Sequence, residues 1–255
     1  MTSIGIFGAR GRMGQAIAQT AAEAGLAVAG GTNGVDGGTI GAQDAPITTD
    51  PAGLAEKVDI LIDFSIPAAL KANIAACVTA GKPLLIGTTG LAAAHHEMID
   101  EAAKSIAVLQ TGNTSLGVNL LAALVREAAQ RLGDDWDIEI VEMHHRHKVD
   151  APSGTALLLG EAAAAGRNIA LADHKASGRD GMTGPRKAGD IGFAALRGGS
   201  VAGDHMVILA SEGERIELGH RAENRFIFAK GAIKAAQWLN GRAPGRYSMA
   251  DVLGL

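Results

Sequence analysis

The sequence predicts an α/β fold with two domains: a Rossmann-like domain built on a doubly wound parallel sheet, and a second α+β domain with a mixed or antiparallel sheet. Three observations support this prediction. Strand and helix patterns alternate through the first half of the chain, a glycine-rich turn follows the first strand, and strand patterns follow one another in the second half. We expect residues 1–115 and 225–255 to form the first domain and residues 116–224 the second.

Composition limits the classes of function. The chain has 255 residues, and its formal charge of −4 and lack of a basic tract argue against nucleic acid as a partner. Cys77 is the one cysteine, so no internal disulfide can form, which indicates a reducing compartment. No signal-peptide pattern precedes the first strand, and no apolar run approaches the roughly 20 residues that span a bilayer. We therefore expect a cytoplasmic protein that does not contact a membrane.

The first motif is a strand over Ser3–Phe7, a glycine turn and a helix over Gln15–Ala24. Its glycines permit a tight turn, close approach of the backbone to a pyrophosphate, and close packing of the helix. The spacing is GxxGxxG, whereas the usual dinucleotide fingerprint is GxGxxG, so the match depends on the flanking strand and helix. A structural glycine turn is the alternative. Within the turn, Arg12 offers a bidentate contact to a phosphate.

The second strand, Leu26–Gly31, ends in Thr32-Asn33-Gly34. An NAD-binding fold often places an acidic residue here for the ribose, and an Arg here would accommodate a 2′-phosphate. Neither residue is present at this point, and Asp36 lies in a Gly-rich loop whose position the sequence does not fix. The sequence therefore leaves the choice between NADH and NADPH open.

The alternation continues through strands over Asp59–Phe64, Pro83–Ile86 and Ile106–Gln110 and helices over Ala68–Ala80 and Val118–Leu132. The three strands end in small or polar residues, namely Asp63-Phe64-Ser65, Gly87-Thr88-Thr89-Gly90 and Thr111-Gly112-Asn113-Thr114-Ser115. In open parallel sheets ligands bind at the carboxyl ends of the strands. We therefore expect a cofactor cleft here, although each segment alone reads equally well as an ordinary turn.

The second domain is expected to contain four strands, over Ile138–His144, Ile191–Arg197, His205–Ala210 and Arg215–Leu218. Between the first two of these strands, Ala172–Asp190 is polar and Gly-rich and is predicted to be a loop. A helix over Phe226–Leu239 then returns the chain to the first domain.

The stretch from Glu142 to Thr155 is the densest in proton-transfer groups. A strand leads into it, Pro152 ends regular pairing, and Ser153 opens an apolar helical run, so the order is strand, charged turn, helix N-terminus. Such a helix end favours a carboxylate. A metal site is not expected, because neighbouring histidines on a strand point to opposite faces and no cysteine completes a tetrahedron. A solvated charged loop is the remaining alternative.

Together these motifs resemble those of one family, the 4-hydroxy-tetrahydrodipicolinate reductases, also called dihydrodipicolinate reductases. The motifs that carry the resemblance are Gly8-Ala9-Arg10-Gly11-Arg12-Met13-Gly14, Asp63-Phe64-Ser65, Gly87-Thr88-Thr89-Gly90, Asn113-Thr114-Ser115-Leu116-Gly117-Val118-Asn119 and the stretch from Glu142 to Thr155. The resemblance implies NADH- or NADPH-dependent reduction of a small dicarboxylate, 4-hydroxy-tetrahydrodipicolinate, to tetrahydrodipicolinate in the diaminopimelate route to lysine. It also implies a cytoplasmic homotetramer whose second domain binds substrate and carries the interface, while the first binds the dinucleotide.

The resemblance further implies roles for the matched residues. It assigns acid/base work to His144, and proton donation and substrate binding to Lys148. Binding of the substrate carboxylates is assigned to His145, Lys148, Ser153, Gly154 and Thr155. Cofactor contacts are assigned to Gly8, Ala9, Arg10, Gly11, Arg12, Met13, Gly87, Thr88, Thr89, Thr111, Gly112, Asn113 and Thr114. These roles agree with the chemistry, since hydride delivery builds negative charge on the ring nitrogen and requires a nearby acid.

The chain departs from the family's pattern in two places. Thr32-Asn33-Gly34 stands where many relatives carry an acidic residue, and the loop Gly184–Asp190 lacks the Pro-Gly-Thr sequence that is usual in the family. Two other functions remain as alternatives: another two-domain dehydrogenase acting on an amino or imino acid, and a nucleotide-binding sensor without catalysis. The presence of His144 and Lys148 argues against the sensor.

Overall fold

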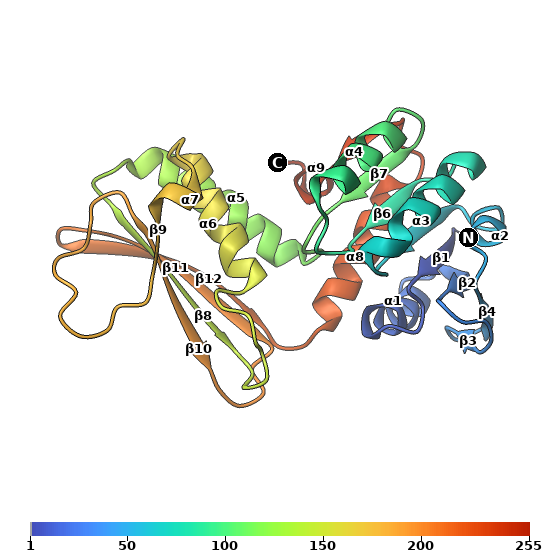
Figure 1. Ribbon diagram of the computed structural model, residues 1–255, viewed down its shortest axis with the longest axis horizontal. Coiled ribbons are helices and arrows are strands. Elements are labelled where there is room, and N and C mark those ends of the chain that lie inside the picture. Colours follow the sequence, from blue (N-terminus) through green and yellow to red (C-terminus); the bar gives the residue numbers. More distant parts are fainter. Residues whose placement is uncertain (1) are drawn as a thin grey trace. The chain divides into compact units, whose positions relative to one another are not determined.

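The computed structural model describes residues 2–255. The chain forms two compact units, shown in Figure 1: unit 1 contains the chain up to Leu116 together with Phe226–Leu255, and unit 2 is Gly117–Arg225. The assignment of cofactor to the first unit and substrate to the second stays a prediction. No helix among the described residues is long and apolar enough to cross a membrane.

Unit 1 is built on an eight-stranded sheet in the order β13-β7-β6-β5-β1-β2-β4-β3. Its strands are β1 (Ser3–Phe7), β2 (Ala27–Thr32), β3 (Thr39–Ile40), β4 (Ala45–Thr48), β5 (Ile60–Asp63), β6 (Leu84–Ile86), β7 (Ala107–Gln110) and β13 (Gly245–Tyr247). All neighbouring pairs are parallel except β3 with β4. The central strands are apolar at nearly every position because helices cover both faces of the sheet.

The helices of unit 1 are α1 (Arg12–Glu23), α2 (Pro51–Ala55), α3 (Pro67–Ala80), α4 (Ala93–Ala102), α8 (Phe226–Leu239) and α9 (Met249–Leu253). Side chains of α1, α8 and α9 pack on one face, in a core with Ile4 and Ile62 of the sheet. Side chains of α2, α3 and α4 pack on the other face, with Phe7 and Leu61. Successive residues of β1 and β5 thus enter opposite cores, and the predicted doubly wound sheet is confirmed.

Unit 2 contains a five-stranded sheet in the order β12-β11-β8-β10-β9. Its strands are β8 (Asp137–His144), β9 (Lys175–Ser177), β10 (Ile191–Arg197), β11 (Gly203–Ser211) and β12 (Glu214–Ala222), and its helices are α5 (Leu116–Leu132), α6 (Gly154–Gly166) and α7 (Leu171–His174). β10 runs parallel to β8 and β9, whereas β11 is antiparallel to β8 and β12, so the expected mixed sheet is confirmed.

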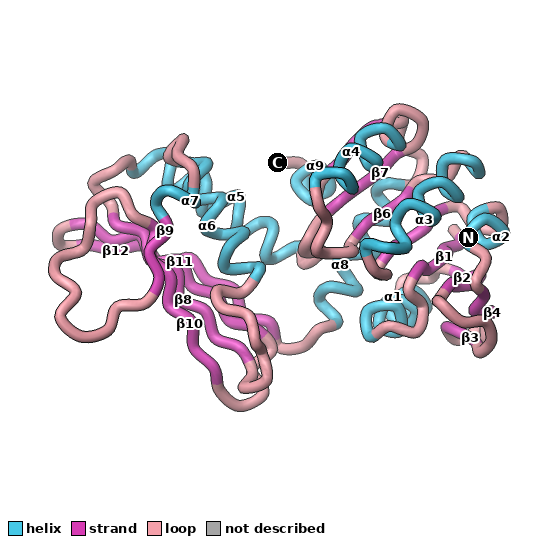
Figure 2. Tube along the Cα trace, viewed as in Figure 1, coloured by secondary structure: helices cyan, strands magenta, loops and turns pink. Residues whose placement is uncertain are grey.

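The helices of unit 2 lie along one face of this sheet (Figure 2). Alternate residues of β8, including Ile138 and Ile140, point into the core beneath α5 and α6. The same alternation places Glu142 and His144 on that buried face, with exposed fractions of 1% and 8%. Two ionisable side chains therefore continue a row of core positions, and each requires a polar partner.

The region 172–190 is more ordered than a simple loop, since it contains the end of α7 and the strand β9. Arg186 fixes the remainder: its guanidinium donates to the carboxylates of Asp137 (2.7 Å) and Glu139 (2.9 Å). β9 has only three residues and no apolar alternation, so it is recognisable only by its pairing with β10.

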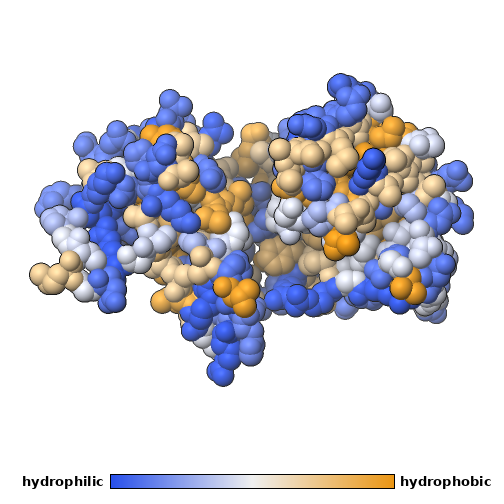
Figure 3. Space-filling view, viewed as in Figure 1, coloured by the Kyte–Doolittle hydropathy of each residue, from blue (hydrophilic) through white to orange (hydrophobic). Residues whose placement is uncertain are grey.

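On the face drawn in Figure 3, hydrophobic residues form small separate patches among hydrophilic ones.

Candidate functional site

The glycine turn after β1 is held close to two other strands of unit 1. The N–H groups of Gly8 and Ala9 both donate to the carbonyl of Thr32 at the end of β2, each at 3.0 Å. Gly8 has φ +82°, and a Cβ on it would lie 2.5 Å from the carbonyl oxygen of Phe64. A Cβ on Gly14 would lie 2.5 Å from the carbonyl of Gly8. Both positions therefore require glycine, which leaves the backbone of the turn open to a phosphate.

Two arginines of this turn have different surroundings. Arg12 is the first residue of α1, and its side chain is exposed at the helix N-terminus. Arg10 extends over the loop that follows β2, where its Nη2 donates to the carbonyls of Asp36 (3.2 Å) and Gly37 (2.5 Å). Asp36 accepts from the N–H of Thr49 at 2.5 Å. The loop that follows β2 thus lies beside the guanidinium of Arg10, and its acidic side chain, Asp36, is hydrogen-bonded to the backbone of Thr49.

A buried carboxylate connects the segments that follow the carboxyl ends of β5 and β6. Asp63 has no exposed surface and accepts hydrogen bonds from the hydroxyls of Ser65 (2.6 Å) and Thr88 (2.9 Å) and from the amide of Asn73 (2.9 Å). Because β7, β6, β5 and β1 are neighbours and parallel, the segments that follow them lie along one edge of the sheet. The sequence singled out these exits, and the structure brings them together.

Some of the expected cofactor residues use their side chains within the protein. The hydroxyl of Thr88 is bonded to Asp63, and that of Thr114 donates to the carbonyl of Phe228 at 2.7 Å. Thr111 donates to the carbonyl of Asn113 at 2.8 Å. Thr89 and Gly112, by contrast, are exposed. A nucleotide at this edge would therefore meet mainly backbone groups, as is usual for phosphates and ribose in this class of fold.

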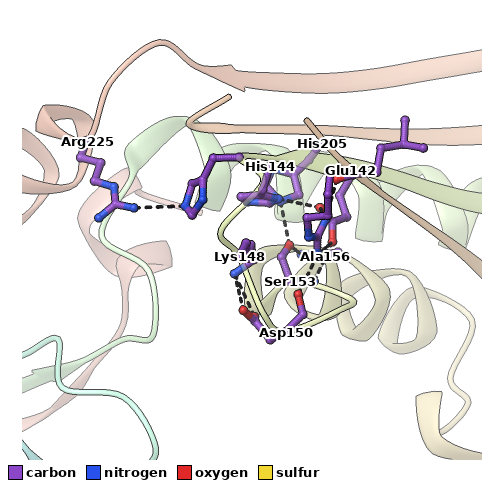
Figure 4. Close-up of polar contacts among 11 residues, drawn as sticks. Glu142, His144, Lys148, Asp150, Ser153, Ala156, His205 and Arg225 are labelled. Carbon is purple, nitrogen blue, oxygen red and sulfur yellow. Dashed lines mark hydrogen bonds and ion pairs between the residues drawn. The ribbon is translucent and has the colours of Figure 1, made fainter. Parts of the chain in front are cut away.

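The second group of residues surrounds the end of β8 in unit 2 (Figure 4). The Nδ1 atom of His144 lies 2.6 Å from Oε2 of Glu142. Arg197, at the end of β10, binds both carboxylate oxygens of Glu142, at 2.8 and 2.9 Å. The N–H of Ser153 donates to Oε1 at 3.1 Å. The acceptor positions of the buried carboxylate are thus filled by an imidazole, a guanidinium and a backbone N–H.

These contacts determine the charge of Glu142. Burial raises the pKa of this carboxyl, but the hydrogen bonds from Arg197 and His144 lower it by more, so the net pKa lies below its ordinary value. Glu142 is therefore ionised at neutral pH and can only accept hydrogen bonds. It follows that Nδ1 of His144 carries a proton, and that Nε2 is the ring atom left for a ligand.

Ser153 joins the start of α6 to β11. Its hydroxyl oxygen accepts from the N–H of Ala156 at 3.1 Å and so caps the helix. The same oxygen lies 3.0 Å from Nε2 of His205, whose ring meets that of His144 edge to face at 5.1 Å. Burial lowers the pKa of His205 to about 4, so this imidazole is neutral at physiological pH. Gly154 and Thr155 form the first positions of α6, where N–H groups point out of the helix end.

The turn between β8 and α6 supplies the remaining groups. Lys148 donates to both carboxylate oxygens of Asp150, at 2.8 and 2.9 Å. His145 lies 3.4 Å from a guanidinium nitrogen of Arg225. Desolvation and the charge of Arg225 hold the pKa of His145 below its ordinary value, which leaves the ring able to accept that bond. Figure 4 shows Lys148 and Asp150 on the same turn as Ser153, below His144.

Sequence reasoning assigned no role to Glu142, Arg197 or His205. The alternation of β8 was a usable signal for Glu142, because it continues through Ile138 and Ile140 to this position. No local signal marks the other two: Arg197 reaches the site through the pairing of β10 with β8, and His205 through the pairing of β11 with β8. Among residues 2–255 no group of three or more His, Cys, Asp or Glu is arranged to hold a metal ion.

Comparisons with known proteins give a consistent result. A family model described as dihydrodipicolinate reductase, N-terminus, matches residues 2–114, and one described as dihydrodipicolinate reductase, C-terminus, matches residues 117–253. The chain is similar to the 4-hydroxy-tetrahydrodipicolinate reductase of Zymomonas mobilis, with 59% identity over 99% of this chain and 97% of that protein. It is 56% identical to the enzyme of the same name from Parvibaculum lavamentivorans, over 98% of this chain and 97% of that one.

A solved structure shows the same fold at greater distance. The dipicolinate-bound dihydrodipicolinate reductase from Paenisporosarcina sp. TG-14 superposes with a TM-score of 0.81 at 21% identity, and the match covers 98% of each chain. At this identity the likeness is one of fold.

Proposed function

The chain belongs to the dihydrodipicolinate reductase family, and from that premise we propose which of its residues bind the two reactants and move the proton. As a member of this family it is an NAD(P)H-dependent oxidoreductase that reduces 4-hydroxy-tetrahydrodipicolinate to tetrahydrodipicolinate, a reaction of lysine biosynthesis. When bound, the dinucleotide supplies the hydride.

Unit 1 holds the dinucleotide in this proposal. The glycine turn fits a diphosphate, because Gly8 and Gly14 leave no room for side chains and α1 begins directly after the turn. The exposed guanidinium of Arg12 supplies a charge-assisted contact at the helix N-terminus. The backbone of Gly87–Thr89 and Thr111–Thr114 lines the same edge of the sheet and completes the binding surface.

Unit 2 holds the substrate. A dicarboxylate requires cations and N–H donors, and the turn from His145 to Thr155 contains Lys148 together with the N-terminal N–H groups of α6. Ser153 adds its hydroxyl. If Nε2 of His205 donates to Ser153, the serine oxygen accepts two bonds, and its own proton is left to point at a carboxylate. The Paenisporosarcina reductase is bound to dipicolinate, which is a dicarboxylate of this kind.

His144 supplies the proton in this proposal. Reduction of the unsaturated ring places negative charge on its nitrogen, and an acid must neutralise that charge as it develops. The single observation that carries the assignment is the 2.6 Å contact of His144 Nδ1 with Glu142, because it occupies one ring nitrogen and leaves Nε2 as the atom that can give a proton to the substrate. Lys148 is the second donor within the same turn, and it also binds a carboxylate.

The cellular setting is part of the proposal. The family resemblance supports a homotetramer assembled through unit 2 and a place in the cytoplasm. We propose small molecules and further copies of this chain as its partners, without nucleic acid or membrane; the formal charge of −4 argues against a polyanion such as nucleic acid.

Initial-rate kinetics with freshly generated substrate and with NADH and NADPH in turn test the function. His144→Ala should lower kcat by roughly 10²–10⁴-fold with little change in cofactor Kd. Lys148→Ala should both lower kcat and raise the KM for substrate. A wild-type kcat in the His144 variant would remove that residue from the mechanism. Absence of turnover with either nucleotide would favour the non-catalytic sensor.

A further inference from the structure

We propose that Glu142 and Arg197 form a pair of opposed charges that fixes the tautomer of His144 and adjusts how strongly its ring holds a proton. Both are positioning residues in this proposal, because they act on the reaction through His144. The inference rests on the proposed function, which makes His144 the proton donor.

The tautomer follows from the bonding of the Glu142 carboxylate. Glu142 is 1% exposed and lies two residues before His144 on the same face of β8. Since this ionised carboxylate has no proton to give, Nδ1 of His144 must be the donor across their 2.6 Å contact. The neutral ring then has a bare Nε2, and the protonated ring delivers its proton from Nε2. Glu142 thereby selects which nitrogen faces the substrate.

The strength of proton binding follows from the balance of two charges. A carboxylate alone beside an imidazole favours the protonated ring, because opposite charges attract. Arg197 opposes that effect, since its bidentate contact largely neutralises Glu142. The contact cannot loosen easily: Arg197 also donates to the carbonyls of Asp150 and Leu196, both at 2.6 Å. The hydrogen bond to Glu142 raises the pKa of Arg197, so its charge persists.

The other charged and titratable groups around His144 come from β11, from β12 and from the turn after β8. β11 contributes His205, which is neutral because burial lowers its pKa to about 4, and β12 contributes His220 behind it, whose pKa burial also lowers. The turn after β8 contributes His145, His147, Lys148 and Asp150, of which the last two are paired with each other. Glu142 therefore provides the one carboxylate that directly contacts the His144 ring among the described residues, and Arg197 is the cation bound to it.

Removal of the carboxylate and removal of the guanidinium should shift the titration of His144 in opposite directions. A purely structural role of the two residues would not give opposite shifts. Histidine-selective ¹⁵N labelling reports the tautomer and the titration of each ring, and the His144 signal is identified by its loss in His144→Asn. In Arg197→Gln the carboxylate is left uncompensated, so the His144 ring should stay protonated to higher pH than in the wild type. In Glu142→Gln the ring should lose its proton at lower pH than in the wild type.

The tautomer gives a second readout. In Glu142→Gln the amide oxygen is expected to keep the bonds from Nη2 of Arg197 and from the Ser153 N–H, which turns the amide NH₂ toward Nδ1 of His144. The neutral ring should then carry its proton on Nε2. Arg215→Gln and Glu217→Gln are the matched controls, since this exposed pair lies on β12 of the same sheet. Neither should shift the titration of His144.

Arg197→Lys covers the case in which Arg197→Gln fails to fold. This variant keeps the positive charge but loses the bidentate contact with Glu142. The shift in the titration of His144 should therefore have the same sign as in Arg197→Gln and be smaller. The inference would be overturned if the titration midpoint of His144 shifted in the same direction in the Glu142 and Arg197 variants, or did not shift in either. Opposite shifts that the pH profile of kcat/KM does not follow would leave the inference standing and reject His144 as the proton donor.

Discussion

The hydroxyl oxygen of Ser153 lies 3.0 Å from Nε2 of His205, although the two residues are 52 positions apart in the chain. Ser153 caps α6, so this bond connects the N-terminus of that helix to β11, the strand next to the edge of the sheet. His205 Nδ1 is buried and has no hydrogen-bond partner among the described residues. The imidazole is thus held by one polar contact in an otherwise desolvated position.

The first prediction concerns stability at acidic pH. The pKa of His205 is lowered from 6.5 to about 4, so the unfolded chain takes up a proton at a pH where the folded chain does not. The associated stability is complete above pH 6.5 and is lost as the pH falls toward 4. Between pH 6.5 and 5 the loss should be about 2 kcal/mol. Urea unfolding at pH 7 and pH 5 should show a smaller decrease for His205→Gln than for the wild type. Equal decreases would contradict the assignment.

The second prediction concerns the pairing of Lys148 with Asp150. A substrate carboxylate must compete with Asp150 for this ammonium group, and Asp150 is largely exposed. Exposed pairs of this kind are worth less than about 1 kcal/mol. Asp150→Asn should therefore lower the KM for substrate by up to about fivefold with kcat nearly unchanged. A higher KM in steady-state kinetics would show instead that Asp150 orients Lys148.

The third prediction separates the two arginines of the glycine turn. Arg12 lies at the start of α1, so Arg12→Ala should weaken the binding of NADH and of NADPH equally, by roughly 1.5–3 kcal/mol. Arg10 lies over the β2 exit, where the 2′ position of the adenosine ribose is expected. Arg10→Ala should therefore weaken NADPH more than NADH. Calorimetric titration with both nucleotides distinguishes the two variants, and selective loss of NADPH in Arg12→Ala would exchange their roles.

The fourth prediction concerns the contact between the exits of β5 and β6. A Cβ on Gly87 would lie 2.2 Å from the ring of Phe64. Gly87→Ala should destabilise the protein by about 1–3 kcal/mol and weaken the binding of both nucleotides, because the clash must displace either the ring or the backbone at this edge of the sheet. Phe64→Leu should relieve the clash, so the double variant should be more stable than the sum of the single changes predicts. Additive effects in thermal unfolding would show that the ring is not the obstacle.

Local sequence patterns were sufficient for much of the fold. The helix Phe226–Leu239 was predicted with both of its ends, and the helix predicted over Val118–Leu132 begins two residues earlier, at Leu116. The strand predicted over Ile191–Arg197 also has the observed bounds. Short elements such as β3 and β9 were missed, because two or three residues carry no periodicity and form strands only through their pairing.

The candidate site, like the fold, has features that local sequence patterns predict and features that depend on tertiary contacts. The sequence by itself determined which residues are available: the glycine turn, and the strand, charged turn and helix start that contain His144, Lys148 and Ser153. These could be found because glycine spacing, alternation and helix capping are properties of residues close together in the chain.

Only the tertiary structure decided how those residues are charged and oriented. Glu142 meets Arg197 across 55 positions, and Ser153 meets His205 through another strand. Such partners depend on the register of β8 with β10 and β11, which is set by how the whole sheet packs its apolar rows against α5 and α6. Because a buried carboxylate or imidazole has no defined charge until its partners are in place, the sequence contains the proton donor but the fold decides from which nitrogen it acts.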